Sequence, residues 1–146
     1  MTTYHSHLFE FLAHLNADKK PEFGKMSAQH MVEHLSGLYM IAIGKVEVPI
    51  FTSEEDLPKR KAFLMSNDDF PRNFKAPMLP EEPLPLRYEN IEIAKDKLKK
   101  LWSLFNEMDS NNFEKNHPTF GKLNYNEWTI AISKHNKHHL LQFNLV

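Results

Sequence analysis

Apolar side chains recur at intervals of three and four residues in four stretches of the chain, and this spacing predicts amphipathic helices. The helices are expected over residues 3–16, 28–45, 89–108 and 124–143. The third has the clearest pattern, because one face gathers its large apolar residues: Ile91, Ala94, Leu98, Leu101, Trp102 and Phe105. Four helices and no evident pair of strands predict an all-α fold, a helical bundle that forms one domain over residues 1–146.

A long irregular segment separates the second of these helices from the third. Prolines interrupt residues 46–88, at Pro49, Pro58, Pro71, Pro77, Pro80, Pro83 and Pro85. Proline fixes φ and lacks a backbone N–H, so only a short helix is expected here, near residues 53–64. A connection of this length is often functional or covers the mouth of a cavity, but a plain crossover between two helices explains it equally well.

The start of the last helix is well marked, because Asn124 and Glu127 have the spacing of a capping box. With about 100° of rotation per residue, Trp128, His135 and His139 then share the helix face that points into the bundle. Imidazole is the commonest metal ligand among side chains, and a spacing of four places two of them one turn apart on one face. His135 and His139 are therefore candidate metal ligands, whereas His138 falls on the flank.

A third candidate ligand is His34, which lies beside the apolar stripe of the second helix. The alternative for His34 is a core histidine that one hydrogen bond satisfies. For His135 and His139 together, two buried imidazoles without a metal or an acidic partner would be costly. Three neutral imidazoles suit Zn²⁺ or Ni²⁺ and leave a position for water or a substrate. We expect four further histidines to be surface or packing residues: His5, His7, His14 and His138.

The composition excludes several kinds of chemistry. The chain has no cysteine, so thiolate nucleophiles and Cys-ligated metal sites are excluded, and any thiol must come from outside. A net charge of −1 gives no basic excess for binding nucleic acid or an anionic membrane. No run of about 18 apolar residues predicts a membrane span, and the first residues lack the pattern of a signal peptide. We therefore expect a cytoplasmic protein.

Several segments resemble those of DinB-like proteins. Residues 26–34 resemble the first metal-ligand segment of that superfamily, and 135–143 resemble its C-terminal His-x-x-His-His-x-x-Gln segment. The His117-Pro-Thr-Phe-Gly loop and the Asn-Glu-Trp ending at Trp128 look like an uncharacterised branch of it. The resemblance implies a four-helix bundle of up-up-down-down topology, with a long crossover between helices 2 and 3. It also implies that His34, His135 and His139 bind a divalent metal, and that a homodimer forms.

The same resemblance implies a metal-dependent enzyme that uses water or a low-molecular-weight thiol against a small electrophile. No residue is assigned to catalysis. His117, Gln142 and Trp102 are candidates for lining a pocket, and each also has an ordinary structural explanation. The alternative function is a non-catalytic stress-response or small-ligand-binding module whose metal site is structural or vestigial.

Overall fold

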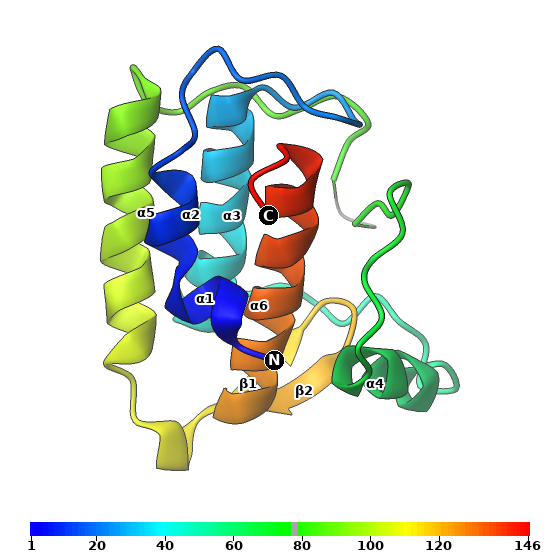
Figure 1. The fold of residues 1–146 in the computed structure, drawn as a ribbon. Helices are drawn as coiled ribbons and strands as arrows, with labels where there is room; N and C mark the ends of the chain where they lie inside the picture. The colour runs from blue at the N-terminus through cyan, green and yellow to red at the C-terminus, as the bar shows by residue number, and fades with distance from the viewer. Residues whose placement is uncertain (77–78) are drawn as a thin grey trace.

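The chain is described here by a computed structural model that covers residues 1–76 and 79–146 (Figure 1). Its helices are α1 (Thr3–Ser6), α2 (Leu8–Leu12), α3 (Ala28–Ala42), α4 (Leu57–Met65), α5 (Ile91–Asn106) and α6 (Tyr125–Gln142). A 3₁₀ turn, η1 (Ser110–Asn112), precedes two strands, β1 (Glu114–His117) and β2 (Gly121–Asn124). The predicted second, third and fourth helices therefore exist as α3, α5 and α6, and the short helix of the crossover exists as α4.

The single helix predicted over residues 3–16 is wrong. The chain bends at His7, whose φ of −109° and ψ of 20° lie outside the helical range, and two short helices result. Beyond α2 the chain turns without forming a further helix. The bend leaves the His5 carbonyl as the acceptor of a 2.9 Å hydrogen bond from Nε1 of Trp102 on α5. Leu8, Leu12 and Leu15 are nevertheless buried, so the apolar pattern identified the buried face correctly.

The helices run in an order that differs from the up-up-down-down topology. Gln29 at the start of α3 donates to the carbonyl of Tyr88, which comes just before α5. At the other end, His5 lies within hydrogen-bonding distance of both Tyr39 of α3 and Asn106 of α5. Helices α3 and α5 are therefore parallel, and α1, α2 and α6 run the opposite way (Figure 1). The order along the chain is up, down, down, up.

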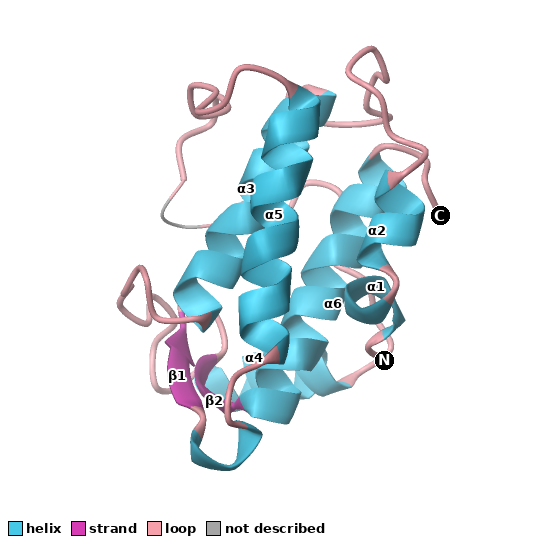
Figure 2. Ribbon diagram, turned by 90° about the vertical axis from the view of Figure 1, so that its left-hand side faces the viewer, coloured by secondary structure: helices cyan, strands magenta, loops and turns pink. Residues whose placement is uncertain are grey.

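This order explains the long crossover. Because α3 and α5 point the same way and lie side by side (Figure 2), the chain must return along their full length between them. Residues 46–76 and 79–88 belong to this return, and they include α4, as predicted, although α4 begins at Leu57. Of the prolines that indicated this irregular segment, Pro77 lies outside the described residues.

The all-α prediction is wrong in one place, where a short antiparallel hairpin precedes α6. Glu114 pairs with Asn124 and His117 pairs with Gly121. The indole Nε1 of Trp128 donates to the Lys115 carbonyl at 3.0 Å and thereby fastens the hairpin to α6. The fold is thus mostly helical with a small two-stranded sheet.

The core fills the space between the helices. Its largest fully buried side chains include Trp128, Tyr39, Phe105 and Phe143. The predicted stripe of α5 is buried, except that Trp102 is only half-buried. Among the described helices, none combines the length and the apolar character that crossing a membrane requires.

Candidate metal centre

Three histidines from two helices meet inside the bundle. His34 comes from α3, and His135 and His139 come from α6. One ring nitrogen of each lies within 4.8 Å of one ring nitrogen of each of the other two. We call His34, His135 and His139 the histidine triad. These are the three residues that the sequence pattern predicted as metal ligands.

Helix caps orient the two helices that carry the triad. The side chain of Asn124 accepts a hydrogen bond from Glu127 N, and Glu127 accepts one from Asn124 N, at 2.9 and 3.0 Å. This capping box fixes where α6 begins and hence which face carries His135 and His139. At the start of α3, Ser27 forms a capping box with His30. His30 is therefore a capping residue and not a member of the triad.

The triad has spacings that suit a shared cation. Nε2 of His34 lies 3.0 Å from Nε2 of His135. Two nitrogen ligands of a tetrahedral Zn²⁺ would be about 3.3 Å apart, given the usual Zn–N bond lengths. The 3.0 Å separation also fits a direct N–H···N hydrogen bond between two neutral rings. The three imidazoles therefore fit a late first-row metal ion. Without a metal, His34 and His135 can instead form a hydrogen bond to each other.

Burial keeps these imidazoles neutral. Desolvation, followed by the charge of His138, lowers the pKa of His34 to about 4. Desolvation also holds the pKa values of His135 and His139 well below the ordinary value, and the neighbouring histidines add to this effect. Neutral rings at pH 7 offer unprotonated nitrogens, which is the form that a metal ion requires.

One atom of the triad has no protein partner. Nδ1 of His135 is buried and has no hydrogen-bond partner among the described residues. By contrast, Nδ1 of His139 lies 2.7 Å from Oε1 of Gln142. An orphaned buried nitrogen is uncommon and costs free energy, so His135 sits at this position at some expense to stability.

The three residues predicted to line a pocket each make a hydrogen bond within the protein. His117 is buried with its Nδ1 accepting from the backbone N of Thr119 at 3.0 Å, and burial lowers its pKa to about 3. Trp102 bonds to His5, and Gln142 bonds to His139. The alternative, structural explanations hold for His117 and Trp102, whereas Gln142 contacts the triad.

A different set of residues surrounds a pocket of about 410 Å³ next to the triad. Its wall includes Phe23, Phe70, Arg72, His138 and Leu141, and we call it the aromatic pocket. The His138 ring packs against the rings of Phe23 and Phe70, with distances between ring centres of 5.5 and 5.9 Å. On its other side it contacts the His139 ring at 4.9 Å, so His138 separates the pocket from the triad. His138 is thus a buried packing residue, as predicted.

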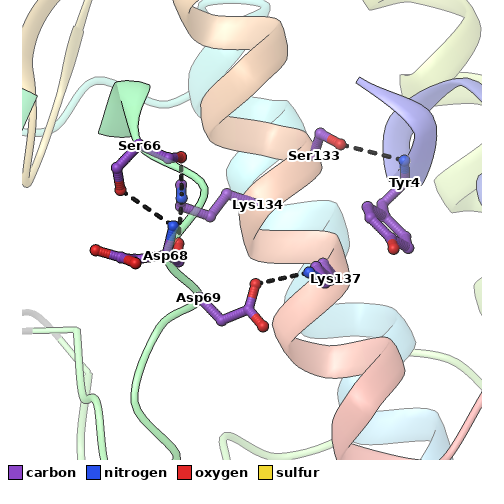
Figure 3. A network of polar contacts seen from close by, with 7 residues as sticks. All are labelled: Tyr4, Ser66, Asp68, Asp69, Ser133, Lys134 and Lys137. Atoms are coloured by element: carbon purple, nitrogen blue, oxygen red, sulfur yellow. Dashed lines mark hydrogen bonds and ion pairs between the residues drawn. The ribbon is translucent and has the colours of Figure 1, made fainter. Parts of the chain in front are cut away.

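The crossover forms one side of this pocket. Phe70 and Arg72 belong to it, and the Arg72 guanidinium lies 4.8 Å from the centre of the Phe23 ring. Lys134 of α6 donates to the carbonyls of Ser66 and Asp68, and Lys137 pairs with Asp69 at 2.8 Å (Figure 3). The crossover thus contributes Asp69, Phe70 and Arg72 to the wall of the aromatic pocket.

Sequence reasoning missed Phe23, Phe70 and Arg72, because no periodic pattern marks residues on loops that meet only in the folded chain. Comparison with known proteins adds no relative to this picture, since no protein-family model, curated protein or solved structure matches the chain.

Proposed function

We propose that this chain is a DinB-like protein that binds one divalent metal ion, Zn²⁺ or Ni²⁺, through the histidine triad, and that it catalyses a metal-dependent reaction on a small molecule. The observation that carries the proposal is the convergence of three ring nitrogens within 4.8 Å from two helices. Three imidazoles are a common ligand set for a catalytic zinc ion, because they leave a fourth position open.

The residues of the site indicate which catalytic roles the protein would fill and which a bound cation would fill. Among the described residues no carboxylate joins the triad, so no acidic side chain there is placed to act as a general base. A bound cation would supply that activation by lowering the pKa of a water or thiol at the open position. The triad would hold it with neutral nitrogens. His139 is buried, whereas His34 and His135 are half-buried, so the site would be only partly screened from bulk water.

The substrate would be a small electrophile that reaches the site beside the aromatic pocket. A volume of about 410 Å³ is within the range of small-molecule sites. If the attacking group is a thiol, it must come from solution, because the chain contains no cysteine. Formation of a homodimer and a cytoplasmic location belong to the same proposal.

One observation favours a second function. The 3.0 Å between His34 and His135 equally suits a hydrogen bond without metal, as a vestigial site would have. The chain would then be a non-catalytic module that binds a small ligand.

Metal content separates the two functions. Untagged protein is analysed by elemental mass spectrometry, together with a His135→Ala/His139→Ala double variant and a His7→Ala/His14→Ala control. His7 and His14 are exposed, so the control removes the same number of imidazoles without touching the triad. About one metal ion per chain is expected in the wild type and in the control, with none in the triad variant, which should remain helical by circular dichroism.

A metal-loaded wild type would then be assayed for consumption of a thiol in the presence of a small electrophile. Absence of metal in all three proteins, with no uptake of added Zn²⁺ or Ni²⁺, would overturn the metalloprotein proposal. A bound metal without turnover would leave only the binding module.

A further inference from the structure

The end of α6 is joined to the turn that precedes α3. The backbone N of Glu22 donates to the Gln142 carbonyl at 2.6 Å, and Nε2 of the Gln142 side chain donates to the Phe23 carbonyl at 2.9 Å. On the other side of the same side chain, Oε1 lies 2.7 Å from Nδ1 of His139. Gln142 is buried, and so is His139. A continuous chain of hydrogen bonds therefore links the 21–24 turn to the histidine triad.

The direction of these hydrogen bonds fixes a proton on His139. A backbone carbonyl only accepts, so the Gln142 atom that faces Phe23 must be the amide nitrogen. The Gln142 atom that faces His139 is then the amide oxygen, which also only accepts. Nδ1 of His139 must therefore carry the ring proton. In the neutral ring this leaves Nε2 as the nitrogen with a free lone pair, the form that a metal ligand needs.

Gly24 gives Gln142 the room that this arrangement requires. A Cβ atom on Gly24 would lie 2.6 Å from Nε2 of Gln142, which is too close for any side chain. The far end of the Gln142 side chain would have to shift, which would disturb the hydrogen bonds that it makes to Phe23 and His139. Gly24 also has a φ of +81°, a conformation that glycine adopts without steric cost.

We propose that Gln142 is a positioning residue for metal binding: held by the Phe23 carbonyl and accommodated by Gly24, it keeps His139 in the Nδ1–H tautomer and so sets the affinity of the triad for its cation. This role rests on the metal-binding function proposed above. Groups that hold the second nitrogen of a ligating histidine typically change metal affinity about 10–100-fold when they are removed.

The first variant is Gln142→Leu, which keeps similar bulk but removes the acceptor. In metal-free protein, long-range ¹H–¹⁵N NMR of the His139 ring reads the tautomer directly. Wild type should give the Nδ1–H form, and the variant should lose it. Competition with a chromophoric chelator for Zn²⁺ should then give a Kd raised about 10–100-fold. Gln142→Glu restores an acceptor for Nδ1–H of His139, although it loses the donor to the Phe23 carbonyl, so it should recover the Nδ1–H tautomer.

Matched controls separate this role from general damage. Gln29 also donates its amide to a backbone carbonyl, that of Tyr88 at 2.8 Å, so Gln29→Leu removes a comparable bond away from the triad. Gly24→Ala should behave like Gln142→Leu. Gly44 has a φ of +82°, and a Cβ there would meet only the flexible end of Lys115, so Gly44→Ala matches the backbone strain alone. Gln29→Leu and Gly44→Ala should both keep the wild-type tautomer of His139 and the wild-type Kd for Zn²⁺.

The outcomes are distinguishable from failure of the proposed function. If wild type binds no metal, the proposed function fails, and the tautomer measurement still tests what Gln142 does to His139. The positioning role is overturned if Gln142→Leu keeps the Nδ1–H tautomer, even where affinity falls. It is equally overturned if the tautomer changes while the Kd for Zn²⁺ stays within about twofold of wild type.

Discussion

The buried histidines of this chain differ in what satisfies their ring nitrogens. Both nitrogens of His5 have partners, Tyr39 Oη at 2.7 Å and Asn106 Oδ1 at 2.8 Å. Since the Asn106 oxygen only accepts, His5 donates from Nε2 and accepts the Tyr39 hydroxyl proton at Nδ1. His135, in contrast, retains one orphaned nitrogen. A histidine whose nitrogens are both paired in this way is structural, whereas Nε2 of His135 lies 3.0 Å from Nε2 of His34 and so faces another imidazole.

His5 gives the first prediction at this scale. His5→Phe keeps a ring of similar size but removes the acceptor of the hydroxyl proton of the buried Tyr39, whose oxygen still accepts from Nδ2 of Asn136 at 3.2 Å. Asn106 is exposed, so its amide can bond to water in the variant. We expect the free energy of unfolding to fall by about 1–3 kcal/mol, because one buried donor loses its acceptor. Urea denaturation followed by circular dichroism measures the change.

The control for His5 is His7→Phe, since His7 is exposed and bonds only to the nearby Glu10. Exposed positions of this kind usually change stability by less than about 0.5 kcal/mol. If the two variants are equally stable, the hydrogen bonds of His5 contribute nothing measurable.

The sequence alone identified the three histidines that the structure brings together as the triad. The cap at Asn124 fixed the rotation of α6, and rotation determines which of its histidines point inwards. Gln142 lies three residues after His139, so helical spacing also placed it near that ring, but only the structure shows that Phe23 orients its amide. The walls of the aromatic pocket had no such signal, because Phe23 and Phe70 are brought together by tertiary contacts alone.

The helices that were predicted well are those with a side-chain cap at the start and a long apolar stripe. Helices α3, α5 and α6 each begin with a side-chain cap, at Ser27, Asn90 and Asn124. The α1–α2 segment has none, and it bends at His7. Strand β1 reads Glu-Lys-Asn-His, which lacks the apolar alternation of a half-buried strand, so the hairpin could not be recognised.

The attachment of the crossover to α6 gives a prediction at this scale. Lys134→Met keeps most of the apolar stem but removes the ammonium group. That group lies 4.7 Å from the centre of the Phe63 ring and donates to the carbonyls of Ser66 and Asp68. We expect amide hydrogen exchange in residues 66–74 to become at least about tenfold faster, because this segment has little regular structure of its own. Exchange in α3 and α5 should not change.

Lys122→Met is the matched control, because Lys122 is exposed and pairs loosely with Glu114 at 3.7 Å. Hydrogen exchange measured by mass spectrometry covers both variants in one experiment. Unchanged exchange in residues 66–74 of Lys134→Met would mean that packing of Phe70, rather than the lysine, holds the crossover in place.

For the whole molecule, the buried imidazoles make stability depend on pH. In the unfolded chain a histidine has a pKa near 6.5, whereas burial lowers the pKa of His117 to about 3 and that of His34 to about 4. Below pH 6.5 the unfolded state therefore binds protons that the folded state does not. Stability is at its full value above pH 6.5 and falls as the pH drops from there towards the folded pKa values.

This linkage predicts a loss that urea denaturation can measure. Between pH 7.5 and pH 5, His117 alone should lower the free energy of unfolding by about 2 kcal/mol, since one pKa unit corresponds to about 1.4 kcal/mol. His14→Ala offers the control, because it removes an exposed imidazole that lies outside the core. Equal stability at pH 7.5 and pH 5 would mean that His117 is protonated in the folded protein as readily as in the unfolded chain.

Added metal should change this dependence in a particular way if the triad binds it. A ligand that binds only the folded state stabilises it by mass action, by about 2.7 kcal/mol at a free concentration one hundred times the Kd. Zn²⁺ should therefore raise the free energy of unfolding at pH 7.5. The gain should shrink at pH 5, because protons compete with the ion for the nitrogens of histidine ligands. His135→Ala/His139→Ala should lose the gain at both pH values while keeping the loss that His117 causes. A Zn²⁺ effect that survives in this variant would place the ion elsewhere in the molecule.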